Sequence, residues 1–194
     1  MRNSMKVFVS GSFMAFCLTL PLAAGPITYT MTGDLSGTLD GTPFLDKAFT
    51  FVLDGNTADI TTFASVVLVD EASSTSISIA GFTTADFTEP VEAAVDPLVG
   101  VAGIINLPDT AGITIGNTGF EPWNLATSLG PLEETGAPFA AVGTFTTSLG
   151  TLVISGAENV SFSASTAAVP EPASVGLVAL SLLGIALRRR WARG

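Results

Sequence analysis

The chain has 194 residues, of which 47% are hydrophobic and 12% are charged, and its formal net charge is −10. This length favours a single domain, and the hydrophobic content argues against intrinsic disorder. Sixteen acids but only one base, Lys47, lie between residues 25 and 169, so a nucleic acid, which needs a basic footprint, is excluded as a partner.

The first 24 residues have the pattern of a secretory signal peptide. Two basic residues among the first six precede a mostly apolar run up to Leu20, and small residues follow. We expect signal peptidase to cut between Ala24 and Gly25, and an uncleaved anchor is the alternative. The single cysteine, Cys17, lies inside this segment, so the mature chain has neither a thiol nor a disulfide.

The middle of the chain, residues 25–168, is predicted to form short β-strands. Runs of Thr, Ser, Val, Ile and Phe are separated by Gly, Pro and Asp, and residues 27–32 alternate apolar with polar side chains. The expected strands are 27–32, 48–53, 65–69, 75–80, 99–107, 112–115, 140–147, 151–155 and 159–165. About nine short strands with turns between them favour an all-β fold, an antiparallel β-sandwich in preference to a closed barrel.

Three stretches are expected to connect these strands. Asp54-Gly55-Asn56 is a turn signal that ends the second strand, and the acidic stretch 82–97 is interpreted as a loop or a short helix. Residues 120–138 contain several prolines and are interpreted as a long connection. The aromatic residues, mostly Phe, recur within the strands and are expected to fill the core.

The residue types leave little room for catalysis. The absence of histidine from the sequence excludes Ser/His/Asp and Cys/His sites and zinc sites of the usual type. A hydrolase that uses two carboxylates stays open as a less favoured alternative. However, Asp70-Glu71 and Glu133-Glu134 are sequence neighbours, whose side chains point apart on a strand, and both pairs are interpreted as solvated turns. Asp109-Thr110-Ala111-Gly112 is likewise interpreted as an acidic turn. We expect a protein that is not an enzyme.

Two binding hypotheses remain for the middle of the chain. Asp54, Asn56 and Asp59 have a partial Ca²⁺-loop spacing, although the full pattern of an EF-hand is missing and no metal or other cofactor is otherwise expected. Trp123 is a candidate for stacking on a sugar, against the more ordinary role of pinning its loop to the sandwich. A glycan- or calcium-binding module is therefore an alternative function.

The last 26 residues, 169–194, combine three features. The motif Pro170-Glu171-Pro172 is followed by an uncharged apolar run over 173–187 and by the basic residues Arg188, Arg189 and Arg190. A helix of this run reaches about 22 Å, which is short of the roughly 30 Å hydrocarbon core, so we expect one marginal transmembrane helix. The arginines predict a cytoplasmic C-terminus.

These features, in this order behind a signal peptide, resemble the PEP-CTERM sorting signal of Gram-negative bacteria. The resemblance implies that exosortase, a membrane-embedded cysteine peptidase, recognises Pro170, Glu171 and Pro172 and cuts near them, while residues 188–190 act as the cytoplasmic stop. It also implies export to the cell surface or extracellular matrix and a link to exopolysaccharide and biofilm. The expected partners are signal peptidase, exosortase, the inner membrane and exopolysaccharide. An ordinary C-terminal anchor is the alternative.

Overall fold

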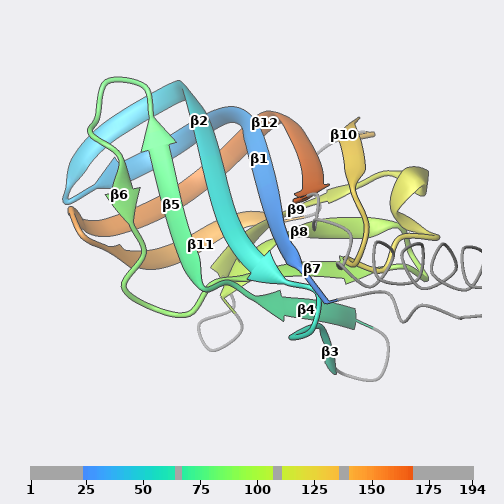
Figure 1. The fold of residues 1–194 in the computed structure, drawn as a ribbon. Helices are drawn as coiled ribbons and strands as arrows, with labels where there is room; N and C mark the ends of the chain where they lie inside the picture. Colours follow the sequence, from blue (N-terminus) through green and yellow to red (C-terminus); the bar gives the residue numbers. More distant parts are fainter. Residues whose placement is uncertain (1–23, 64–66, 107–110, 136–139, 168–194) are drawn as a thin grey trace, which may run out of the picture.

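The computed structural model describes residues 24–63, 67–106, 111–135 and 140–167 (Figure 1). The strands are β1 (Pro26–Leu39), β2 (Thr42–Asn56), β3 (Thr61–Phe63), β4 (Val67–Glu71), β5 (Ser74–Ile79), β6 (Ala85–Asp86), β7 (Glu92–Asp96), β8 (Val101–Asn106), β9 (Ala111–Gly116), β10 (Leu129–Glu133), β11 (Ala140–Thr147) and β12 (Gly150–Thr166). One 3₁₀ turn, η1 (Thr118–Phe120), precedes β10, and the described ranges contain no α-helix.

The strands form one antiparallel sheet with the order β3-β4-β7-β8-β9-β11-β12-β1-β2-β5-β6, and β10 adds to β12. The all-β, antiparallel prediction is therefore confirmed. The described residues form a 12-stranded sheet, whereas nine strands were expected, because several short strands were not predicted. Strands β1, β2 and β12 are also longer than expected, with 14, 15 and 17 residues. The predicted helix at 173–187 lies outside the described residues.

Strand β11 divides the sheet into two halves that face each other. Its first residues pair with β9, and Gly143–Thr147 pair with β12. Half A contains β1, β2, β5, β6, β10 and β12, and half B contains β3, β4, β7, β8 and β9 (Figure 1). At the transfer point Gly143 has φ 131°, and a Cβ there would collide with Ala111 of β9, so only glycine fits. This sandwich-like arrangement closes further where Phe87, after β6, bridges back to Thr147 of β11.

The core lies between the two halves. The apolar residues of β1 that alternate in sequence, Ile27, Tyr29 and Met31, are all buried, which confirms the interpretation of 27–32 as a half-buried strand. The prediction that aromatic residues fill the core is confirmed for many of them. The largest fully buried side chains include Tyr29, Phe51, Phe120, Phe145 and Phe162. Each such side chain contributes about 1.5–3 kcal/mol relative to an exposed one.

The prediction that 151–155 and 159–165 are separate strands was wrong. They are one strand, β12, because the polar stretch between them continues the ladder: Gly156 pairs with Ser36, and Ala157 is buried. A β-bulge then shifts the register, with Asn159 at φ 52°, and the strand bends instead of ending.

The interpretation of 82–97 as a loop or short helix was also wrong. This stretch contains β6 and β7, and in β7 the small residues Ala93 and Val95 face the core while Glu92 and Asp96 are only partly buried. The acids that weakened the strand signal therefore lie on the outer face of half B, where charge is tolerated. The expected long connection over 120–138 is also interrupted by a strand, because β10 lies within it.

Candidate functional site

The two ends of the folded domain lie next to each other. Ile27 at the start of β1 pairs with Thr166 at the end of β12, and the Ala167 amide donates a hydrogen bond of 3.1 Å to the Pro26 carbonyl. The predicted signal-peptidase site, Ala24 and Gly25, is also here. The Gly25 amide donates to Thr57 Oγ1 at 3.0 Å, and its carbonyl accepts from the Thr57 amide at 3.0 Å. Both predicted processing sites therefore flank one end of the domain.

The predicted sorting residues Pro170, Glu171 and Pro172, and the basic cluster Arg188, Arg189 and Arg190, lie outside the described residues. They begin three residues after Ala167. Among the described residues, no helix has the length and apolar character that a membrane crossing requires. The marginal transmembrane helix over 173–187 therefore stays a prediction.

The three candidate calcium ligands occupy the end of β2 and the turn after it. Asp54 pairs with Thr28 and Ser74 on the two neighbouring strands, and its carboxylate accepts hydrogen bonds from both hydroxyls at 2.8 and 2.9 Å. Asn56 Oδ1 accepts from the Ala58 amide at 3.0 Å, and the Asp59 amide donates to the Asn56 carbonyl. The turn therefore begins at Asn56, later than the sequence signal predicted. No cluster of three or more acidic residues that suits a metal ion occurs in the described ranges.

Trp123, the candidate sugar-stacking residue, is only 4% exposed. Its ring packs against Tyr29, Phe120 and Phe162 with centroid distances of 5.7–6.3 Å, and its indole N–H donates to the Thr127 carbonyl at 2.9 Å. This is the geometry of the pinning role, because the ring faces are occupied by protein.

The most unusual polar group is Asp70, which is fully buried. The interpretation of Asp70-Glu71 as a solvated turn was wrong for Asp70: it faces the core from β4, whereas Glu71 is exposed. The Tyr29 hydroxyl lies 2.7 Å from Asp70 Oδ2 and 3.1 Å from the Leu125 carbonyl oxygen. Gly55 lies against the same carboxyl, and a Cβ at this position would collide with Asp70 Oδ2. Tyr29, Asp70 and Leu125 thus join β1, β4 and the loop before β10.

The donors and acceptors around the Tyr29 hydroxyl indicate the protonation state of Asp70. A tyrosine hydroxyl has one proton to donate, whereas the Leu125 carbonyl and an ionised carboxylate can both only accept. Both contacts of the Tyr29 hydroxyl are satisfied if Asp70 is protonated and donates to Tyr29, which then donates to Leu125. Burial raises the pKa of Asp70, and the nearby Asp59 carboxylate raises it further. Hydrogen bonds that the ionised carboxylate accepts from the Tyr29 hydroxyl and the Asn56 amide act in the opposite direction and lower the pKa. Its second oxygen, Oδ1, has no partner in the described structure, which costs less in a neutral carboxyl. We therefore expect a neutral Asp70.

Glu92 and Glu134, which were expected in a loop and in a solvated turn, are both partly buried. Glu92 lies directly opposite Glu71 on neighbouring strands, and burial, together with that second carboxylate, raises the pKa of Glu92. Glu134 is partly buried, and burial raises its pKa although the Val160 and Asn159 amides donate to it. Glu71 and Glu92 are the pair closest to what a carboxylate-based hydrolase would need, yet neither lines the grooves of about 330, 310 and 360 Å³ described for the domain.

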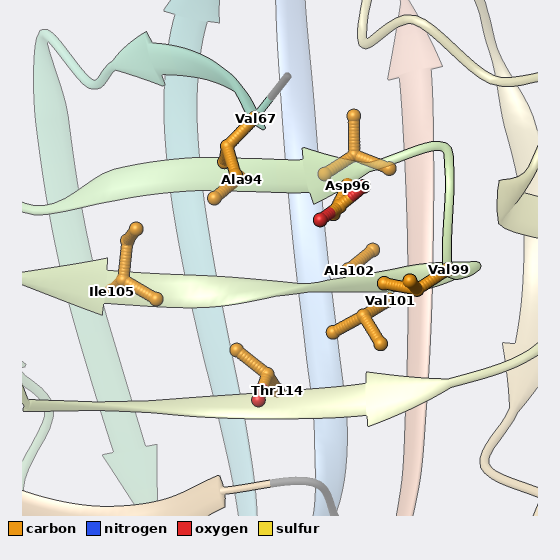
Figure 2. Close-up of a pocket in the computed structure, with 9 residues that line it drawn as sticks. Val67, Ala94, Asp96, Val99, Val101, Ala102, Ile105 and Thr114 are labelled. Atoms are coloured by element: carbon orange, nitrogen blue, oxygen red, sulfur yellow. The ribbon is translucent and has the colours of Figure 1, made fainter. Parts of the chain in front are cut away.

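An apolar groove with a volume of about 330 Å³ lies on the outer face of half B. Figure 2 shows it over β7, β8 and β9, with half A strands crossing behind them. Val67, Val99, Val101 and Ile105 are among its apolar lining residues, and Asp96 stands at one end. Asp96 and Thr114 are the polar side chains among the residues that line it, and the buried Thr114 hydroxyl has no hydrogen-bond partner among the described residues.

Asp70 and Gly55 are the residues that sequence reasoning missed. The one available signal was Tyr29, the single tyrosine of the chain, at an inward-facing position of an alternating strand. A buried phenol needs a hydrogen-bond partner, but nothing in the sequence shows which of the acids supplies it.

Comparison with known proteins identifies a motif in the tail. Residues 168–190 match the model of the PEP-CTERM protein-sorting motif, which includes Pro170, Glu171, Pro172 and the three arginines. Neither a curated protein nor a solved structure matches the chain. The motif implies an exported protein that exosortase targets to the cell surface. The chain therefore carries a PEP-CTERM protein-sorting motif at residues 168–190.

Proposed function

We propose that the chain is a surface or extracellular-matrix protein without enzymatic activity that exosortase cleaves near Pro170-Glu171-Pro172. The observation that carries the proposal is the match over 168–190, which contains the motif, the apolar run and the basic stop in their functional order. Before cleavage, the run 173–187 anchors the chain in the inner membrane with the C-terminus in the cytoplasm.

The position of the motif relative to the fold supports this proposal. Strand β12 ends at Thr166, and Ala167 is still hydrogen-bonded to Pro26, so only two residues separate the folded domain from Pro170. Proline has no amide N–H and disfavours helix in the residue before it, so the sequence of the motif favours an extended segment, which a protease substrate requires. Cleavage there removes the tail and leaves the domain whole.

The composition and the packing support a role without catalysis or a cofactor. The domain has one cation, Lys47, and no histidine to act as a base. Asp70, one of the carboxyls whose pKa burial raises, is fully buried between the two halves, where no substrate can reach it. A structural role in the matrix, close to exopolysaccharide, agrees with an acidic surface that keeps an exported domain soluble.

The test is the intact mass of the protein from cells with and without exosortase. We expect a mature form that begins near Gly25 and ends near Pro170 when exosortase is present, and a form that retains Arg188–Arg190 when it is absent. Full-length C-termini in cells that contain exosortase would refute the proposal.

A matched pair of variants links the cleavage to the motif. Glu171→Gln removes the charge of the sorting motif, whereas Glu121→Gln removes the charge of an exposed Glu-Pro dipeptide, Glu121-Pro122, within the domain. We expect the first variant to retain its tail and the second to be processed like the wild type.

A further inference from the structure

The turn between β7 and β8 presents two apolar side chains to solvent. Leu98 is 72% exposed and Val99 is 65% exposed, and we call these two residues the apolar tip. The turn is well defined, because the Leu98 amide donates to Asp96 Oδ1 at 2.9 Å and Gly100 has φ 65°. An ordered turn that holds two large apolar residues in water has an energetic cost, which a partner surface would remove.

The apolar tip lies at the end of the domain where the chain leaves it. The Asn117 amide donates to the Gly100 carbonyl at 2.8 Å, which ties the turn to η1. The loop after η1 then reaches the strand ends, because Leu125 accepts from Tyr29 and Ser128 lies 2.9 Å from the Thr166 hydroxyl. Figure 1 shows the end of β7 on the same side as the start of β1 and the end of β12, with the β1–β2 and β11–β12 turns on the opposite side.

The tether is shorter than the domain. The five residues 168–172 between Ala167 and the predicted membrane segment span at most about 18 Å. A folded chain of this length has a radius of gyration of about 15 Å, and the 14 residues of β1 extend over up to about 45 Å. The tether therefore keeps the end of the domain that carries Ala167 within about 18 Å of the predicted membrane segment.

We propose that the apolar tip contacts the lipid surface of the membrane while the tail anchors the chain. This inference rests on the proposed function, since it needs residues 173–187 in the membrane. Two side chains suffice because the tether gives the tip a high effective concentration at the surface, so a contact too weak for free protein becomes populated. The groove that continues from Val99 to Val101 and Val67 extends the apolar surface behind the tip (Figure 2).

The acidic residues near the apolar tip indicate which lipid charge the tip would tolerate. Asp96 and the exposed Glu121 flank the turn, and Glu121 Cγ lies close to Gly100. These carboxylates disfavour an anionic surface, so the partner is a zwitterionic lipid surface such as phosphatidylcholine, and contact should weaken as anionic lipid is added.

The experiment places a polarity-sensitive fluorophore at single cysteines in the tailed chain. The mature sequence after Gly25 has no cysteine, so Leu98→Cys, Leu45→Cys and Leu180→Cys each give one labelled site. Leu45 is the matched control, because it is 71% exposed but lies near the β1–β2 turn at the opposite end. The protein is purified from cells without exosortase and reconstituted in phosphatidylcholine vesicles with and without a nitroxide-labelled lipid.

We expect blue-shifted emission and quenching by the nitroxide lipid at positions 98 and 180, and neither at 45. A shifted probe at 180 with an unshifted probe at 98 would overturn the inference but leave the anchoring intact. An unshifted probe at 180 would instead refute the anchoring itself, and with it both proposals. A shift at 98 that the nitroxide lipid does not quench, and that grows with protein density, would indicate contact between two copies and would also overturn the inference.

Discussion

Replacing Tyr29 with phenylalanine removes one oxygen atom and should strongly destabilise the domain. The ring keeps its neighbours Trp123 and Phe162, at centroid distances of 6.2 and 6.3 Å, so packing is nearly unchanged. What is lost is the hydroxyl that lies 2.7 Å from Asp70 Oδ2 and 3.1 Å from the Leu125 carbonyl. Since Asp70 and Leu125 are both 0% exposed, water cannot replace it.

The magnitude follows from these two buried groups. Leaving one buried hydrogen-bonding group without its partner costs about 1–3 kcal/mol, so Tyr29→Phe, which affects two such groups, should cost about 2–6 kcal/mol in the free energy of unfolding. That is a large fraction of the roughly 5–15 kcal/mol available to a domain. At roughly 3 °C per kcal/mol, the melting temperature should fall by roughly 6–18 °C.

Urea and thermal unfolding of the wild type, Tyr29→Phe, Asp70→Leu and the double variant measure this effect. In the Asp70→Leu background the tyrosine substitution leaves only the Leu125 carbonyl unpaired, so its cost should drop to about 1–3 kcal/mol. Asp54→Asn is the control, because Asp54 is an acid that accepts side-chain hydrogen bonds at an exposed position. If Tyr29→Phe changed the free energy of unfolding by less than about 0.5 kcal/mol, the buried cluster would not be stabilising the fold, and the reasoning would be refuted.

Four further outcomes are expected. Burial raises the pKa of Asp70 above its ordinary 3.8. The contribution of Asp70 to stability is therefore full below about pH 3.8 and is lost as the pH rises through the raised pKa. Asp70→Asn should remove this fall in stability from a series of urea unfolding midpoints measured at increasing pH. Gly55→Ala should lower the melting temperature, because the new methyl group collides with Asp70 Oδ2. Trp123→Phe should cost about 1–3 kcal/mol, mainly through the cavity that the smaller ring leaves in the core, because the Thr127 carbonyl that it frees is on an exposed residue. Leu98→Ser should leave the melting temperature within about 1 °C of the wild type, since Leu98 is exposed.

The sequence predicted what local patterning controls. Alternation in residues 27–32 predicted which face of β1 is buried, and runs of β-branched residues predicted β5, β8, β9 and β11 to within a few residues. Tertiary context decided the rest. Asp54-Gly55 resembles a turn, but strands on both sides continue the ladder, and glycine is needed there because the Asp70 carboxyl lies against it.

The buried cluster could not have been found from the sequence for a related reason. Asp70 ends an apolar strand next to Glu71, and a strand terminus beside a second acid is usually solvated. Its burial depends on half B folding over the start of β1, which no local pattern encodes. The sorting tail is the opposite case: its recognition depends on a linear segment, and the residues named from the sequence lie within the matched range 168–190.

The pairing of β1 with β12 joins the two ends of the described domain. Ile27 lies opposite Thr166, and the Ala167 amide donates a hydrogen bond to the Pro26 carbonyl. The cut that we expect between Ala24 and Gly25 would leave Pro26 in the domain, and a cut near Pro170 would leave Ala167 in it. Neither predicted cut would therefore remove a residue of this contact, so we expect the mature domain to keep the pairing that joins its ends.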